Sequence, residues 1–257
     1  MRRICFLSLK GGTGKTTTSF NVSCNLAARG LKVLAVDLDP QGYMTWSFGE
    51  STSAGRKNVN DVMRGTPVRE AIRVTKAGVH LLAADLELTT ADLELQAENR
   101  EFLIQKAVEG LNYDVVVYDC CPFLGILSVN ALVASDDLII PTEPEYLAMR
   151  GVRQLYLKVV QLIKKDLNPG LEFSGVVITR FDSRKNVHKR TAEKIDKMFP
   201  GKVFSTFIRT NVALAEAGVK SMPVAQFAPS SNGAIDYLSL TEEIVHRYGL
   251  EESGDDD

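Results

Sequence analysis

The stretch LSLKGGTGKTTT, residues 7–18, decides the fold class, because it joins an apolar strand to a helix through a glycine-rich loop. The apolar run ICFLSL, residues 4–9, predicts the strand, and a helix is predicted to open at Lys15. Glycines in such a loop let backbone N–H groups approach a phosphate, and the start of a helix favours anions. The stretch therefore predicts a phosphate-binding loop, but it leaves a second lysine, Lys10, without a role.

The loop departs from the usual G-x-x-x-x-G-K-[ST] pattern, because Leu9 stands where the first glycine is expected. The physical parts are nevertheless present, so we interpret the loop as a variant that binds a nucleotide. The weaker alternative is a glycine-rich strand-to-helix turn that binds no ligand and carries its lysines by chance. The residues predicted to contact the phosphates from this loop are Gly11, Gly12, Thr13, Gly14, Lys15, Thr16 and Thr17.

Further apolar runs alternate with stretches of helical spacing, which predicts a doubly wound α/β fold with a mostly parallel sheet and helices on both faces. The near-continuous apolar character of VVVY and LII is typical of strands that are covered on both sides. The runs that predict the other strands are KVLAVDLD, VHLLAA, YDVVVYD, DLIIPTE and FSGVVITRFD.

Long helices are predicted from about Lys15 to Arg29, Thr89 to Glu109 and Val152 to Lys165. The last of these is expected to bury Leu155, Val159 and Leu162 on one face. Residues 49–66 are expected to be loop with a short helix. We predict one P-loop ATPase domain over residues 1–250 and an unstructured acidic tail over 251–257.

The composition is that of a globular chain, with 45% hydrophobic and 24% charged residues among 257. The four cysteines have no spacing typical of a disulfide framework or a zinc site. No apolar run approaches the roughly 18 residues of a membrane span, and the N-terminus lacks the pattern of a signal peptide. We expect a cytoplasmic protein.

Acidic residues end two of the predicted strands, Asp37 and Asp39 in VDLDPQG and Asp119 in YDVVVYDCCPFLG. Because the carboxyl ends of parallel strands line the ligand crevice, these carboxylates are expected beside the phosphate loop. An acid after an apolar strand is the arrangement that holds Mg²⁺ through water in P-loop enzymes. Taken alone, Asp119 has an equal claim to be a helix cap. Thr16, Asp39 and Asp119 are the predicted Mg²⁺ residues.

These motifs together resemble the ParA family of deviant-Walker ATPases, which are relatives of MinD. The resemblance rests on KGGTGKTT, DLDPQG and DCCPFLG, and it continues through PTEPEYLAMRG and TNVALAEAG to APSSNGAIDYLSLTEEI. It covers nearly the full chain, about residues 2–248. It implies a P-loop ATPase with ATP and Mg²⁺ as cofactors.

The resemblance also implies roles for individual residues. Lys10 would reach the phosphates bound by a second subunit, while Lys15 would serve its own subunit, and both would be catalytic. Asp39 would orient the attacking water. Gly125 would offer a backbone N–H near the γ-phosphate, and Arg209 and Asn211 would lie on the adenine side. Cys121 replaces a proline of the family's switch segment, which implies a less rigid turn.

A basic cluster lies between residues 180 and 202, with eight Lys or Arg and three acids in a chain whose net charge is −2. Such a cluster suits sequence-independent contact with DNA phosphates, although an ordinary solvated helix face remains the alternative. Arg184 falls where the family has a DNA-contacting arginine, whereas Ala213 stands where some members have another. The predicted DNA-binding residues are Arg180, Arg184, Lys185, Lys189 and Arg190.

A MinD-like membrane association is disfavoured, since it requires a basic amphipathic C-terminal helix and this chain ends EESGDDD. Ile235, Leu238, Val245 and Tyr248 are instead expected to form the core-facing stripe of a last helix. A bridging iron–sulfur cluster is also disfavoured, because adjacent Cys120 and Cys121 at a buried strand end suit it poorly.

The resulting hypothesis is an ATP-dependent switch that forms an ATP-sandwich homodimer and binds DNA non-specifically on the nucleoid. A ParB-like adaptor would stimulate slow hydrolysis to segregate a plasmid or chromosome. The positioning of a protein cargo and a nucleotide-dependent scaffold with negligible turnover remain alternatives. The identity of the cargo is left open by the sequence.

Overall fold

The computed structural model describes residues 1–51, 55–96 and 98–250. The acidic tail predicted at residues 251–257 lies outside the described residues. Seven strands form one sheet in the order β3-β4-β2-β5-β1-β6-β7, with all neighbours parallel except the antiparallel pair β3 and β4. The strands are β1 (Arg2–Phe6), β2 (Val33–Leu38), β3 (Ile72–Val74), β4 (His80–Leu82), β5 (Val115–Cys120), β6 (Asp137–Thr142) and β7 (Glu172–Ile178).

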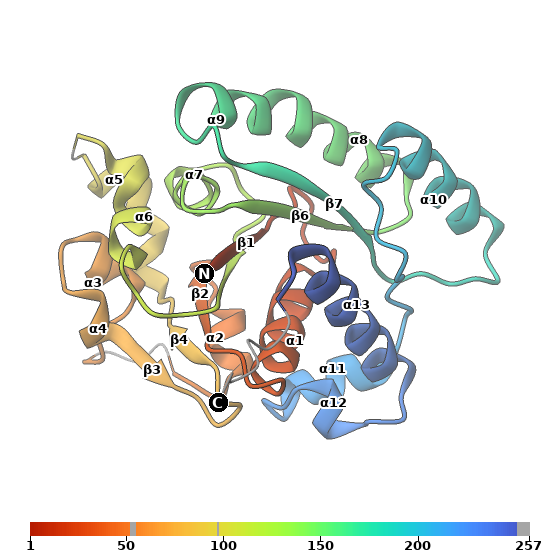
Figure 1. Ribbon diagram of the computed structural model, residues 1–257, viewed down its shortest axis with the longest axis horizontal. Coiled ribbons are helices and arrows are strands. Elements are labelled where there is room, and N and C mark those ends of the chain that lie inside the picture. Colours follow the sequence, from red (N-terminus) through yellow and green to blue (C-terminus); the bar gives the residue numbers. More distant parts are fainter. Residues whose placement is uncertain (52–54, 97, 251–257) are drawn as a thin grey trace, which may run out of the picture.

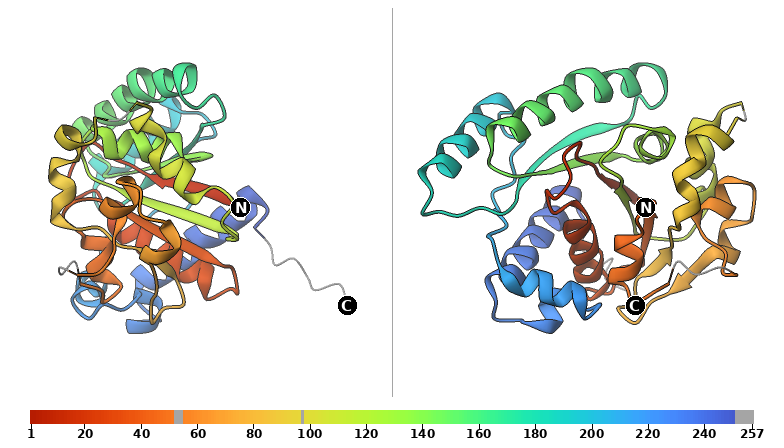
Figure 2. Two further views of the ribbon diagram at one scale, coloured as in Figure 1. Left: turned by 90° about the vertical axis from the view of Figure 1, so that its left-hand side faces the viewer. Right: turned by 180° about the vertical axis from the view of Figure 1, so that it is seen from behind.

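Helices cover both faces of this sheet, as the predicted fold class requires (Figures 1 and 2). The larger core cluster packs α3–α10 on one face, and the smaller one packs α1, α2 and α11–α13 on the other. The helical segments are α1 (Lys15–Ala27), α2 (Tyr43–Ser47), α3 (Val59–Met63), α4 (Val68–Ala71), η1 (Leu86–Thr90), α5 (Ala91–Glu94), η2 (Arg100–Phe102), α6 (Leu103–Val108), α7 (Ile126–Val133), α8 (Tyr146–Gln154), η3 (Leu155–Val160), α9 (Gln161–Asp166), α10 (Asn186–Met198), α11 (Val212–Val219), α12 (Val224–Phe227) and α13 (Asn232–Tyr248).

The six predicted strands are all present, and the short antiparallel β3 was not predicted. Three residues at the sheet edge carry too little periodicity to distinguish a strand from the surrounding loop. The long helix predicted over residues 89–109 is wrong. It is divided into short 3₁₀ and α segments, and the left-handed backbone of Asn99, with φ of 60°, interrupts the helical path.

The helix predicted over residues 152–165 begins earlier, at Tyr146, and contains a π-helical segment, η3. Leu155 is buried as expected, but Leu162 is 57% exposed and Ile163 is buried in its place. A π turn accommodates an extra residue, so the buried stripe shifts by one position. The expected role of Leu162 in the core is therefore wrong.

The last helix, α13, also buries a different stripe from the predicted one. Val245 is buried as expected, but Ile235 and Leu238 are 47% and 42% exposed. The neighbouring positions Tyr237 and Leu240 are buried against α1 and the sheet. Apolar spacing alone did not reveal which of two adjacent stripes packs inward, because both stripes carry large apolar residues.

Candidate nucleotide-binding site

The phosphate loop runs from the end of β1 to the start of α1, at the edge of the sheet where the parallel strands have their carboxyl ends. Gly12 and Gly14 both have φ of +80°, a conformation that strains any residue with a side chain. The carbonyl of Gly14 accepts hydrogen bonds from the backbone N–H and the hydroxyl of Thr18, at 2.8 and 2.7 Å. No side chain caps the N-terminus of α1, so its first amides remain available to an anion.

Lys15, the first residue of α1, is only 7% exposed. Burial lowers the pKa of Lys15, but the carboxylates of Asp119 and Asp39 outweigh this effect and leave the pKa above its ordinary value. The ammonium group therefore stays charged in the interior. Thr16 and Thr17 follow on the same helix turn and are half-buried.

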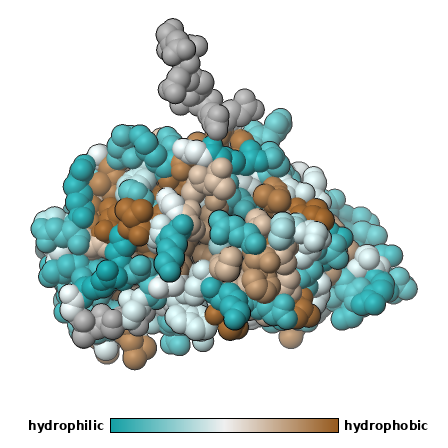
Figure 3. Space-filling view, turned by 90° about the horizontal axis from the view of Figure 1, so that it is seen from below, coloured by the Kyte–Doolittle hydropathy of each residue, from teal (hydrophilic) through white to brown (hydrophobic). Residues whose placement is uncertain are grey.

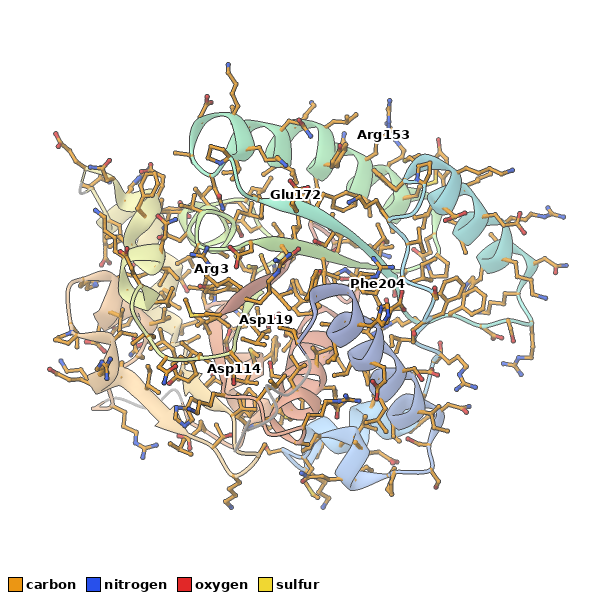
Figure 4. All side chains as sticks on the ribbon, viewed as in Figure 1. Arg3, Asp114, Asp119, Arg153, Glu172 and Phe204 are labelled. Atoms are coloured by element: carbon orange, nitrogen blue, oxygen red, sulfur yellow. The ribbon has the colours of Figure 1, made fainter. Side chains whose placement is uncertain are left out.

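Asp119 lies at the end of β5, in the middle of the molecule (Figure 4). In the sheet it is opposite Phe6 of β1 and Asp37 of β2, so three strand ends meet beside the loop. The side chain is fully buried, and among the described residues neither carboxylate oxygen has a partner with hydrogen-bond geometry. Burial raises the pKa of Asp119, and Lys15 and the nearby hydroxyl groups of Thr16 and Ser19 oppose that rise.

The segment that carries Asp39 is held by Asp37, which sequence reasoning did not assign. Asp37 is fully buried and accepts hydrogen bonds from the N–H of Asp39 at 3.1 Å and from the N–H and hydroxyl of Thr45, both at 2.8 Å. The Thr45 hydroxyl in turn accepts from the N–H of Ala84 at 3.0 Å. Burial and the nearby Asp119 charge raise the pKa of Asp37 to about 7. Asp39 itself is 5% exposed and accepts a hydrogen bond from the N–H of Gln41.

Lys10 lies apart from Lys15, with a side chain that is 42% exposed. Its Nζ atom forms ion pairs with Glu143 and, at 2.8 Å, with Glu145, both on the segment between β6 and α8. The hydrogen bond from Lys10 to Glu143 is the main cause of its raised pKa. Glu143 also lies 3.5 Å from Arg180. Sequence reasoning missed both acids, although their place after an apolar strand was the same signal that found Asp119.

A cavity of about 520 Å³ extends from the phosphate loop to α11. Its volume is within the range of small-molecule sites. Gly14 and Thr17 line the phosphate end, and Arg209 and Asn211 line the far end. The structure thus places these four predicted residues around one cavity. Other lining residues include Glu143, Glu145, Thr179, Arg180, Lys185, His188, Val212, Leu214 and Tyr237.

Two lining residues hold the loop in place and were not predicted. The hydroxyl of Thr179 donates to the carbonyl of Thr13 at 2.7 Å. The hydroxyl of Tyr237 lies 3.1 Å from that of Thr18 on α1. Both come from distant parts of the chain, so nothing in their local sequence indicated this role.

Gly125 lies at the start of α7, where the carboxylate of Asp92 accepts a hydrogen bond from the N–H of Ile126 at 2.7 Å. A Cβ atom at Gly125 would be 2.4 Å from Asp92 Oδ2 and 2.7 Å from the Phe123 ring. The preceding turn is braced by Cys121, whose Sγ lies 3.5 Å from the carbonyl oxygen of Phe123.

The predicted DNA-binding residues lie on or next to α10, at the edge of the molecule (Figure 1). Arg184 is highly exposed, and Asp182 binds its guanidinium group through two hydrogen bonds of 3.0 Å. Arg180 and Lys185 also line the nucleotide cavity, whereas Lys189 and Arg190 are exposed on α10 itself. The structure therefore brings Arg180 and Lys185 to the nucleotide cavity, and places Arg184, Lys189 and Arg190 outside its lining.

The sequence disfavours contact with a membrane, and two features of the described residues bear on this expectation. Within the described ranges, every helix is too short or too polar to span a lipid bilayer. The face shown in Figure 3 carries separate hydrophobic patches in a largely hydrophilic surface.

The parallel sheet, the glycine loop leading into α1, the buried Lys15 and the acid that ends β5 define a P-loop nucleoside triphosphatase. A family model described as an AAA domain matches residues 1–173. The chain is 39% identical over 254 residues to the sporulation initiation inhibitor protein Soj of Bacillus subtilis, which covers 94% of this chain and 97% of that protein.

Solved structures agree with this class. A cobyrinic acid a,c-diamide synthase from Mycobacterium smegmatis with bound ATP analogue and magnesium is 30% identical, with a TM-score of 0.84 over 97% of this chain and 96% of that one. The septum site-determining protein MinD from Pyrococcus horikoshii, complexed with Mg-ADP, is 25% identical, with a TM-score of 0.79 over 98% and 99%. The chain is also 34% identical over 256 residues to the chromosome partitioning protein ParA of Myxococcus xanthus, a match that covers 96% of this chain and 88% of that protein. The chain therefore belongs to the ParA family, and it is an ATPase that uses ATP and Mg²⁺.

The residues present fit a magnesium ion. A buried carboxylate without hydrogen-bond partners is costly unless a bound group or water satisfies it, and Asp119 is such a carboxylate. Asp119, Asp39 and the hydroxyl of Thr16 are the oxygen donors that would hold Mg²⁺, partly through water. When bound, the ion would neutralise charge on the phosphates.

Proposed function

We propose that this ATPase is a DNA-segregation switch, formed by one domain over residues 1–250. ATP drives two copies into a sandwich dimer, the dimer binds DNA without sequence preference, and a ParB-like adaptor stimulates hydrolysis and release. The names of relatives support the segregation role, since a protein of Treponema pallidum that is 34% identical is called the chromosome-partitioning ATPase Soj. We propose that it acts in the cytoplasm on the nucleoid.

The observation that carries this proposal is the separate placement of the two loop lysines. Lys15 is buried between Asp119 and Asp39, where it can neutralise phosphates bound by its own loop. Lys10 is 42% exposed and forms ion pairs with Glu143, which is largely buried, and with the exposed Glu145. A lysine whose side chain reaches the surface is available to a nucleotide held by a second copy, where added positive charge accelerates phosphoryl transfer.

DNA binding is supported by the +5 net charge of residues 180–202 and by the exposure of α10. The test is a gel shift with non-specific duplex DNA and ATP at several salt concentrations. Because Lys185 lines the nucleotide cavity, Lys189→Glu with Arg190→Glu is the cleaner variant. This variant should weaken DNA binding but still dimerise in ATP. The logarithm of its DNA association constant should fall less steeply with the logarithm of the salt concentration, with a slope smaller in magnitude by about 2.

Lys76→Glu is the matched control, since Lys76 is an exposed lysine in the turn between β3 and β4, outside the cluster. The control should bind DNA nearly as the natural chain does. Equal DNA binding by the α10 variant at every salt concentration would exclude this surface. Phosphate release with DNA and a candidate adaptor then distinguishes a stimulated switch from a scaffold with negligible turnover.

A further inference from the structure

The far wall of the nucleotide cavity is a segment that follows Phe204, next to the end of α13 in Figure 4. On one side, this segment pairs with β7 and its continuation. The N–H of Ile208 donates to the carbonyl of Ile178 at 2.8 Å, and the N–H of Phe181 donates to the carbonyl of Ile208 at 2.9 Å. On its other side the segment contacts α13, so both β7 and α13 hold the segment in place.

Two carboxylates of α13 hold this segment. Asp236 and Glu243 are seven residues apart, which is two helical turns, so they lie on the same face. Glu243 accepts hydrogen bonds from the N–H groups of Ser205 at 2.9 Å and Thr206 at 3.1 Å. Asp236 binds the other end of the segment, at Arg209. Only that end borders the cavity.

The contact between Asp236 and Arg209 is the more extensive of the two. Asp236 accepts from the backbone N–H of Arg209 at 2.8 Å, from its Nε atom at 3.0 Å and from its Nη2 atom at 2.6 Å. The Asp236 side chain is 8% exposed, whereas Arg209 is 42% exposed and lines the cavity. The guanidinium group is therefore held by a buried partner, and paired hydrogen bonds of this kind fix its direction.

The residue after Asp236 reaches the opposite wall. Tyr237 is buried and its hydroxyl contacts Thr18, which in turn binds the carbonyl of Gly14. One turn of α13 thus connects the far wall, through Arg209, with the phosphate loop, through Thr18. The separation of the two walls depends on these contacts.

We infer that Asp236 is a positioning residue that sets the base-binding end of the nucleotide cavity. A nucleotide whose phosphates lie at Gly14 must place its base toward Arg209, because the cavity extends in that direction. By fixing Arg209, Asp236 determines how closely that wall approaches the base, and hence how much the base end of the nucleotide adds to its binding affinity. This inference rests on the placement of the nucleotide in the proposed function.

The test compares Asp236→Asn with Glu243→Gln. Both changes replace a carboxylate with its amide on the same face of α13, and both affect the same segment, but Glu243 does not border the cavity. Binding of ADP and of inorganic pyrophosphate to the monomer is measured by calorimetry, together with the melting temperature. Pyrophosphate lacks the base, so we expect Asp236→Asn to lower the ratio of ADP to pyrophosphate affinity about tenfold, and Glu243→Gln to leave that ratio unchanged.

An unchanged ratio in Asp236→Asn, or an equal fall in both variants, would overturn the inference, since a purely structural role would alter only the melting temperature. Should Asp236→Asn fail to fold, Arg209→Lys provides the same test, because lysine keeps the charge but loses the fork that binds both carboxylate oxygens. The experiment needs neither DNA nor a dimer. Its failure therefore leaves the proposed switch untouched, whereas loss of dimerisation or DNA binding would count against the switch alone.

Discussion

The Nζ atom of Lys10 lies 2.8 Å from the Oε2 atom of Glu145 in the same chain. With Glu143 as a second partner, Lys10 remains 42% exposed, whereas Lys15 is buried, with the charges of Asp119 and Asp39 nearby. Two lysines only five residues apart therefore occupy different environments.

Lys10→Ala should leave ATP binding by the monomer within about threefold and lower the hydrolysis rate about 10³-fold, the scale of a charge supplied by a partner in phosphoryl transfer. Binding of a fluorescent ATP analogue and phosphate release measure the two effects. Lys15→Ala is the comparison, because it should abolish binding itself. Loss of ATP binding in Lys10→Ala would mean that both lysines serve one site.

Asp39→Ala should trap an ATP-bound dimer, since the proposed role of Asp39 is to orient the water and its side chain makes a single hydrogen bond, to Gln41. Light scattering in ATP should give the mass of a dimer, while phosphate release falls to background. A monomer under these conditions would contradict the role of Asp39 in water positioning.

Gly125→Ala should displace the Asp92 carboxylate, because the new Cβ would lie 2.4 Å from Asp92 Oδ2. Loss of this cap on α7 should cost about 1 kcal/mol of unfolding free energy. In a double-mutant cycle measured by urea unfolding, Asp92→Ala should lower the free energy of unfolding by a similar amount. The double variant should lower it by little more than either single change. Full additivity would show that the two residues do not share this contact.

The unfolding free energy of the nucleotide-free protein should fall as the pH rises from about 4 to about 7. The pKa of Asp37 is raised to about 7 in the fold, so the folded state binds more protons than the unfolded chain across this window. One additional bound proton changes the free energy of unfolding by at most about 1.4 kcal/mol per pH unit. At pH 7 the folded-state carboxyl is still half protonated, so the slope from Asp37 vanishes only above about pH 8, where Asp37 is ionised in both states.

Asp37→Asn is the control for this pH dependence, because it removes the titrating carboxyl group itself. Urea unfolding at several pH values should give a shallower slope in that variant than in the natural chain. The same slope in both proteins would show that the titration of Asp37 does not cause the pH dependence.

Much of the fold was predictable, because buried parallel strands leave near-continuous apolar runs that require no knowledge of their neighbours. Elements whose form depends on contacts with other elements could not be predicted from their own sequence. The π-helical segment shifted the buried stripe from Leu162 to Ile163, and the exposed Ile235 and Leu238 show the same dependence in α13. The short β3 forms only because β4 lies beside it.

The sequence by itself determined the phosphate loop, its lysines and the acids at the ends of β2 and β5, because local spacing and the parallel sheet bring such residues to one edge. Only the tertiary structure decided what holds them. Asp37 binds Thr45, Glu143 binds Lys10, and Asp236 binds Arg209. The latter two partners are distant in the chain, so their pairing depends on how the helices pack around the sheet.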